Sequence, residues 1–261
     1  MTDLSARIGL AEVGLALGLV LVAIVVSRHR RLGLEGDIGV ATVRAFAQLM
    51  AVGFVLDYVF GGRGWLTPVV LLAMVVAATL TAGRRGRSVP GARLVAGASL
   101  TVATAATLGV LIGLGIVPAT PRAGIPLGSM ILSTAMNATS LVMARLHDDL
   151  AANRREVEAR LSLGARSHDA AGPWHRAALR TGMLPIVDQT KVVGLVALPG
   201  AMTGMILAGA SPADAIRLQL VVMYMLLGGA AFAAVVAGEL TLRRLFTPDH
   251  QLIRSLRRAP S

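Results

Sequence analysis

Long uncharged apolar runs recur along the chain, and short polar segments rich in arginine, glycine and proline separate them. A helix needs roughly 20 apolar residues to cross a bilayer core about 30 Å thick, and the runs have this length. Strand-length alternation of apolar and polar residues is absent, which argues against a β-barrel. The pattern predicts an all-α, polytopic membrane protein with about seven transmembrane helices, at 9–27, 38–60, 66–83, 94–117, 125–146, 184–208 and 212–240.

The connecting segments alternate in charge. Four of them are rich in arginine: 28–37, 84–93, 147–183 and the tail from Arg243. The other three carry one arginine or none: 61–66, 118–124 and 210–212. Because basic loops favour the cytoplasmic side, we expect an N-out/C-in multi-pass protein of the cell (inner or plasma) membrane. One membrane domain, 1–261, accounts for the whole chain.

The formal net charge of +11 changes this picture little. In a soluble protein such a charge would suggest nucleic acid as a partner. Here most arginines lie in the short loops between apolar runs, so we expect them to set topology and contact anionic lipid. No nucleic acid partner is predicted.

The segment 147–183 is the one long polar stretch. Its first part favours a helix that ends in "EARLSLGA" (158–165), where Gly164 suits the left-handed residue after a helix. A second helix, about 169–181, then leads into the sixth span. Such a helical knob is either an amphipathic connection on the cytoplasmic leaflet or a docking element for a cytosolic partner.

The stretch "PIVDQTKVVGLVALPGAMTGMILAG" (185–209) places charge inside an apolar run. Asp188 and Lys191, the single lysine of the chain, are three residues apart and can pair on one helix face. Counted from Pro185, Lys191 lies about 9 Å from the cytoplasmic end of the span. The pair either anchors the helix, with the lysine reaching the interface, or lines the mouth of a translocation path.

Further candidates for the translocation path are residues that break the sixth span and side chains that could bind a passing ion. Pro199 and Gly200 are expected to break the sixth span, either as a packing kink or as part of a substrate site. Methionine is usually adaptable packing, although thioethers also pass soft cations. The complete set of path candidates is Asp188, Lys191, Pro199, Gly200, Met202, Met205, Met136 and Asn137.

Several chemistries are not expected. The chain has no cysteine, and all five histidines fall in predicted cytoplasmic segments, which excludes a tight thiolate or imidazole metal site within the membrane. A phosphate-binding G-x-x-x-x-G-K-[ST] loop is also missing. We therefore expect no resident cofactor and no enzymatic activity, and ATP hydrolysis would have to come from a separate chain.

Two motifs resemble those of known transporters. "EARLSLGA" looks like the coupling motif of ABC transporter permeases, with Glu158, Ala159 and Gly164 at matching positions. The 185–209 stretch, "IPLGSMILSTAMNA" (125–138) and "HQL" (250–252) resemble the FetB-type permease family across essentially the whole chain. In the fifth span that family tends to place asparagine just before Ala-Met, whereas here Thr134 precedes them and Asn137 follows.

The resemblance implies a homodimeric membrane permease that exports iron or a related metal ion, with two cytosolic ATP-binding cassette ATPase subunits. It implies that Glu158, Ala159 and Gly164 couple the permease to the ATPase. A stand-alone secondary transporter for a small ion or organic solute is the alternative, since a broken span suits it. An intramembrane enzyme is the weakest hypothesis, because Asp188 has no acid–base partner except Lys191.

Overall fold

The described residues of the computed structural model, 9–62, 64–196 and 198–257, form helices joined by short loops. Within these ranges no strand is formed, and Phe246 and Leu252 form an isolated antiparallel bridge. The chain divides into two compact units, 1–64 with 200–216 and 65–199 with 217–261. The all-α prediction is confirmed, while the prediction of a single domain stays a prediction.

The first unit contains α1 (Leu10–His29), α2 (Glu35–Phe60) and α8 (Gly200–Leu207). The turn between α1 and α2 is fixed by Ser27, whose hydroxyl donates to a Glu35 carboxylate oxygen at 3.1 Å and accepts the Leu34 N–H at 3.1 Å. Nearly every side chain of α1 and α2 is exposed within the chain, although both helices are strongly apolar. Exposed apolar helices of this kind suit a lipid environment, where lipid tails cover the side chains.

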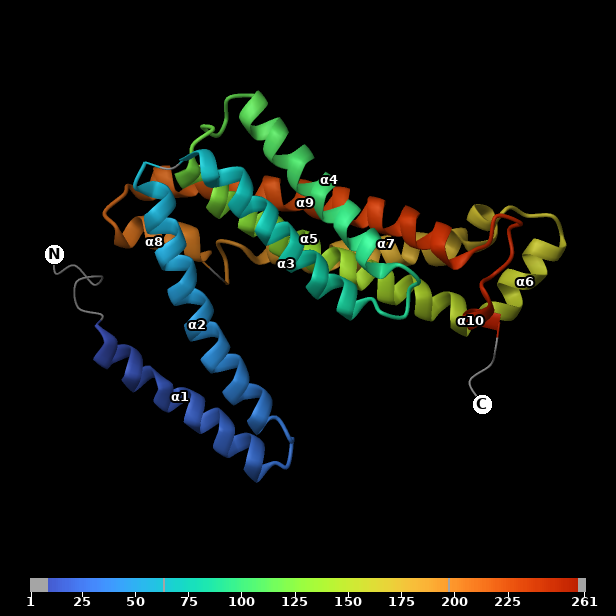
Figure 1. Ribbon diagram of the computed structural model, residues 1–261, viewed down its shortest axis with the longest axis horizontal. Coiled ribbons are helices and arrows are strands. Elements are labelled where there is room, and N and C mark those ends of the chain that lie inside the picture. The colour runs from blue at the N-terminus through green and yellow to red at the C-terminus, as the bar shows by residue number, and fades with distance from the viewer. Residues whose placement is uncertain (1–8, 63, 197, 258–261) are drawn as a thin grey trace. The chain divides into compact units, whose positions relative to one another are not determined.

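The second unit is a bundle of long helices (Figure 1). It contains α3 (Thr67–Arg85, preceded by the 3-10 turn η1, Gly64–Leu66), α4 (Ala92–Gly113), α5 (Pro121–Ala152), α7 (Ser167–Val192) and most of α9 (Pro212–Leu245). The short helices α6 (Arg154–Ser162) and α10 (Arg254–Arg257) lie at one end of this bundle. Helix α5 packs against α3, α4 and α7 and is therefore its central element.

The buried core of the second unit forms two clusters along the bundle. One cluster joins Val89, Leu146, Val157 and Leu252, which come from all three arginine-rich segments of this unit or from their borders. The other cluster includes Leu111, Val117 and Met223, and it fills the opposite end. The segments 84–93 and 147–183 and the tail thus gather at one end, as the predicted charge alternation requires. Which side of a membrane this end faces stays a prediction.

Small residues allow the helices to approach closely. A Cβ atom at Gly182 of α7 would lie 2.5 Å from Val142 Cγ2 and 3.0 Å from the carbonyl oxygen of Ala138, both on α5. At Gly238 of α9 it would lie 2.6 Å from Leu179 of α7. These two glycines therefore hold α7 between α5 and α9.

Replacing Gly182 with alanine is expected to destabilise the bundle by about 1–3 kcal/mol, the usual cost of overpacking, because the Ala138 carbonyl is backbone and cannot move aside. Gly109→Ala in α4 is the matched control, since a Cβ there meets nothing within 4 Å and alanine favours a helix. Thermal unfolding in detergent measures both variants. A Gly182→Ala protein as stable as the Gly109→Ala control would contradict the close α5–α7 packing.

Six described helices are long and apolar enough to cross a membrane, and they correspond to six of the seven predicted spans. The remaining prediction, 184–208, is wrong as a single helix, because α7 ends at Val192 and α8 begins at Gly200. The break therefore starts well before Pro199. Gly194 adopts φ +82°, a left-handed conformation that glycine adopts without strain and that commonly follows the end of a helix. Pro199 instead precedes the start of α8, a place where proline is well tolerated.

Candidate functional site

The predicted docking element is built as a helix, a glycine turn and a second helix. Helix α6 ends at Ser162, Gly164 follows with φ +89°, and α7 starts at Ser167. The left-handed glycine predicted at 164 is confirmed. The second helix is longer than predicted, because α7 continues from Ser167 through Pro185 to Val192 without interruption.

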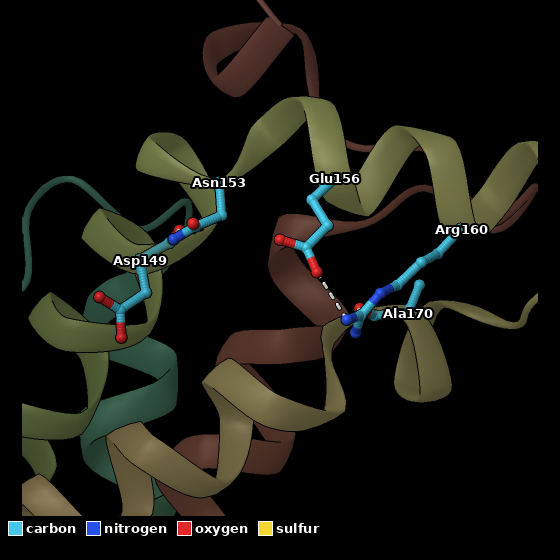
Figure 2. Close-up of polar contacts among 5 residues, drawn as sticks. All are labelled: Asp149, Asn153, Glu156, Arg160 and Ala170. Carbon is cyan, nitrogen blue, oxygen red and sulfur yellow. Dashed lines mark hydrogen bonds and ion pairs between the residues drawn. The ribbon is translucent and has the colours of Figure 1, made fainter.

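Helix α6 is fastened to both of its neighbours. The Asn153 side chain, between α5 and α6, donates from Nδ2 to the Asp149 carbonyl at 2.8 Å. Figure 2 shows the Arg160 guanidinium between Glu156 and Ala170, with 2.6 Å to Glu156 Oε1 and 3.4 Å to the Ala170 carbonyl oxygen. Arg160 also lies 5.0 Å above the ring of Trp174 on α7. These contacts link any displacement of α6 to α7.

The predicted coupling residues lie on this element with different exposures. Glu158 is half-buried and pairs with Arg154 at 3.5 Å, while Ala159 and Gly164 are exposed. Leu163, directly before the glycine, is 89% exposed. The sequence analysis missed Leu163, although a leucine in a polar tip beside a left-handed glycine was a signal for a contact surface.

Asp188 and Lys191 form the predicted pair. Lys191 Nζ donates to Asp188 Oδ1 at 2.9 Å, and the two side chains are 66% and 61% exposed, respectively, within this chain. The spacing of three residues on α7 brings them together, as expected from helix geometry. Their exposure leaves the ion pair open to solvent, cargo or another chain.

The depth of this pair in a membrane stays a prediction, and the structure shows what surrounds this part of α7. Because α7 begins at Ser167, it already packs against Ala138 and Val142 when it reaches Gly182. Further along, Gln189 shares a cavity with Thr134, which lies near the middle of the predicted span 125–146. Lys191 lies two residues beyond Gln189 on the same helix. Whether the pair anchors the helix at the interface or lines a path stays a prediction.

A small cavity lies where α5, α7 and α9 meet, with a volume of ≈ 80 Å³. Thr134 and Asn137 line it from α5, one turn apart, and Gln189 lines it from α7. The FetB-type family tends to place asparagine at position 134, whereas this chain has Thr134 there and Asn137 one turn later. Both side chains line the same cavity. Arg85, at the end of α3, donates from Nη1 to Asn137 Oδ1 at 3.0 Å. The sequence analysis missed Arg85 and Gln189.

Polar groups inside a membrane need a polar neighbour. A charged side chain at the centre of a bilayer costs about 2.5–3.5 kcal/mol on insertion scales, and Asn137, Asp188, Gln189 and Lys191 are all exposed within the chain. Such groups commonly face a water-filled path or the interior of an assembly. The surface of α5 and α7 around the cavity is therefore the best candidate for a translocation path.

The other path candidates have different surroundings. Met136 is half-buried and packs against both core clusters, which is an ordinary packing role. Met202 and Met205 are half-buried on α8 of the first unit, one turn apart. Pro199 and Gly200 lie at the junction of the units, at the end of the non-helical segment 193–199, of which residue 197 is outside the described residues.

A histidine and a carboxylate face each other at the arginine-rich end of the bundle. His175 Nε2 of α7 lies 4.0 Å from Glu239 Oε2 of α9, and the His168 and His175 rings are 5.6 Å apart. His175 belongs to the predicted cytoplasmic segment. Burial lowers the pKa of His175 most strongly, His168 and Arg176 lower it further, and Glu239 acts in the opposite direction.

The lowered pKa of His175 predicts acid sensitivity. Because the pKa of this imidazole is lower in the folded protein than in the unfolded chain, the unfolded chain takes up the proton first as pH falls below the ordinary value of 6.5. The stability that depends on the neutral ring is therefore present above pH 6.5 and is lost as pH falls below it. We expect the melting temperature to drop between pH 7.5 and pH 5.5, as measured by thermal unfolding in detergent.

His175→Gln should reduce this drop, whereas His29→Gln, at the exposed end of α1, should leave it unchanged. An unchanged pH profile in His175→Gln would contradict the assignment.

Comparison with known proteins adds to this geometry. Residues 10–246 match the model of the uncharacterised protein family UPF0014. The chain belongs to the UPF0014 family. It is 40% identical to Protein ALUMINUM SENSITIVE 3 of Arabidopsis thaliana, over 94% of this chain and 90% of that protein. It is 37% identical to the probable iron export permease protein FetB of Escherichia coli, over 93% of this chain and 94% of that protein.

The UPF0014 membrane protein STAR2 of Oryza sativa is similar at 39% identity, over 94% of this chain and 86% of that protein. No solved structure gave a significant match. The rice and E. coli relatives are named as a membrane protein and a permease protein, respectively. The similarity to the FetB-type family predicted from the sequence is confirmed. Membership of UPF0014 and six apolar helices make this chain a multi-pass membrane protein.

Proposed function

We propose that this UPF0014 protein is the membrane-spanning subunit of an ABC transporter that exports iron or a related metal ion, powered by a separate ATPase. The observation that carries the proposal is the 37% identity to the probable iron export permease of E. coli over 93% of this chain. The exposed turn at Leu163 and Gly164 supports it, because it offers a partner a helical element that protrudes at the arginine-rich end.

The contacts of α6 suggest how ATPase movement reaches the cavity. A force applied at Leu163 acts on α6, and Arg160 passes it to α7 through Ala170 and Trp174. Helix α7 is one continuous rod that carries Gln189 and the Asp188–Lys191 pair. A small tilt of α7 would then change the cavity between α5 and α7, and the non-helical segment after Val192 would absorb the displacement.

The donor groups at the candidate path suit a hard cation in transit. Asn137 and Gln189 offer amide oxygens and Asp188 a carboxylate, the ligand types that hard cations prefer. Within the described residues no group of three or more His, Asp or Glu side chains is arranged to hold a metal ion. In our proposal, a passing cation displaces Lys191 from the Asp188 carboxylate. When the cation leaves, Lys191 pairs with Asp188 again.

A homodimer would complete the path. Asp188 and Lys191 are more than half exposed in one chain, and a second copy facing α5 and α7 would enclose them with water between the two copies. The two α6 elements would then engage two ATPase subunits.

The test is co-purification followed by an ATPase assay. The permease is expressed with its candidate ATPase, isolated as a complex and reconstituted into liposomes with Fe²⁺ inside or outside. We expect a stable complex whose ATP hydrolysis is stimulated by the metal. A permease that retains no ATPase subunit would contradict the ABC assignment. A stable complex that no metal stimulates would keep that assignment and contradict the metal cargo.

A stand-alone secondary transporter is the second candidate, and the break between α7 and α8 favours it, since discontinuous helices are common at the substrate sites of such transporters. Transport by the purified chain alone, driven by an ion gradient without ATP, would establish this alternative.

A further inference from the structure

A second hollow lies at the arginine-rich end of the bundle, apart from the cavity at Asn137. It has a volume of ≈ 500 Å³ and is open on one side. Arg84 of α3, Arg87 of the following loop and Arg93 of α4 line it, together with Leu94. Arg244 of α9 reaches the same place, because a Cβ atom at Gly91 would lie 3.5 Å from its guanidinium carbon.

Two glycines bring these arginines together. Gly83 leaves room for Arg93, whose Cγ atom would lie 2.6 Å from a Cβ at position 83, so the stem of Arg93 lies directly against α3. Gly91 adopts φ +71° and turns the chain into α4 beside Arg244. The arginine cluster is thus a product of the packing of α3, α4 and α9 and not only of the basic sequence 84–93.

The residues that the structure describes do not compensate the positive charge of the pocket. No acidic residue lines the pocket, and neither Arg84, Arg87, Arg93 nor Arg244 forms an ion pair with a described residue. Elsewhere at this end of the bundle, arginines such as Arg145 and Arg160 do pair with carboxylates. Arginine forks that converge on an open pocket without a carboxylate are suited to phosphate oxygens.

The wall of the pocket indicates that the phosphate belongs to a lipid. Exposed apolar side chains follow one face of α3 at spacings of four residues, Leu72, Val76 and Leu80, and the next position in this series is Arg84. Leu94, at the rim, is 66% exposed. An acyl chain can lie along this stripe while its headgroup reaches the arginines, whereas a soluble phosphate would make no contact with the stripe.

We propose that the pocket lined by Arg84, Arg87 and Arg93, with Arg244 beside Gly91, binds the phosphodiester headgroup of an anionic phospholipid, with an acyl chain on the Leu72–Val76–Leu80 face of α3. The predicted topology places this pocket at the cytoplasmic leaflet, where basic pockets between membrane helices bind anionic headgroups. The lipid would hold the ends of α3, α4 and α9 together. This site is independent of the cargo and of the ATPase.

Native mass spectrometry of the full chain in mild detergent tests the site, with phosphatidylglycerol and phosphatidylcholine of equal chain length as probes. We expect wild type to prefer phosphatidylglycerol, and this preference to decline as salt rises. Arg87→Gln and Arg93→Gln should each weaken phosphatidylglycerol binding about five-fold. Arg30→Gln, an exposed arginine outside the pocket, should leave it unchanged. Leu80→Ser should weaken binding without changing the charge.

Two results would overturn the proposal. Equal binding of the two lipids by wild type, or a preference that survives both arginine substitutions, would show that the pocket does not recognise an anionic headgroup. Displacement of phosphatidylglycerol by millimolar inorganic phosphate, with no effect of Leu80→Ser, would assign the pocket to a free phosphate. The salt and phosphate titrations use the wild-type protein, so a variant that fails to fold does not leave the question open.

Discussion

Replacing Leu163 with aspartate is expected to disconnect the permease from its ATPase. Leu163 is 89% exposed at the tip between α6 and α7, so it can enter a partner's pocket without rearrangement of this chain. A charge there would be buried unpaired in the complex. The loss of a central apolar anchor typically costs about 2 kcal/mol or more, which is roughly 30-fold in affinity. Affinity of the reconstituted permease for the ATPase, and the stimulated ATPase rate, should both fall accordingly.

Leu163→Met is the matched control, because methionine keeps the volume and apolar character and should retain coupling. Glu158→Arg is expected to change both the docking surface and the stability of α6, because Glu158 is half-buried and pairs with Arg154. A Leu163→Asp permease that binds and stimulates the ATPase as wild type does would exclude this tip from the docking surface.

Breaking the Asp188–Lys191 pair is expected to have the second large effect. Asp188→Asn and Lys191→Met should each lower metal transport about 10- to 100-fold, the range found when the groups that orient and tune a metal's ligands are changed. The ATPase should still bind, because the pair lies on α7 far along the chain from α6. Metal flux in proteoliposomes, measured beside ATPase binding, separates the two effects.

A charge exchange decides whether the pair does more than anchor the helix. The double variant Asp188→Lys with Lys191→Asp keeps an ion pair three residues apart on α7 and therefore restores an anchoring role. We expect it to remain folded but to transport poorly, since the carboxylate moves away from the cavity level marked by Gln189. Full transport by the exchanged pair would reduce Asp188 and Lys191 to a structural contact.

The local features of the fold could be predicted from the sequence, because each depends on short-range spacing. Apolar run lengths gave six helices that the structure contains, the three-residue spacing gave the Asp188–Lys191 pair, and the glycine after "EARLSL" gave the turn at Gly164. The beginning of the helix that carries this pair could not be located in this way. Pro185 resembles a helix start, yet α7 continues through it, since neighbouring helices can compensate for a missing backbone donor in a bundle.

The candidate cavity was only partly predictable. Asn137 was identified as a polar residue within a span, but its partner Arg85 is 52 residues away in the chain. Arg85 belongs to an arginine-rich segment whose charge was assigned to membrane topology. Gln189 was visible beside Asp188, and nothing in its spacing indicated that it faces Thr134. The arginine pocket likewise depends on Gly83 and Gly91, whose close contacts follow from the tertiary packing of α3, α4 and α9.

ATP-driven metal movement across a sealed membrane tests the central claim most directly. The permease and its candidate ATPase are reconstituted into liposomes, and Fe²⁺ is followed with an indicator dye on the side opposite the metal. Our account predicts Fe²⁺ transport away from the face that carries the ATPase, dependent on ATP hydrolysis and about 10- to 100-fold slower with Lys191→Met. Equal Fe²⁺ movement without ATP, or ATP hydrolysis that never moves a metal ion in any lipid composition, would contradict it.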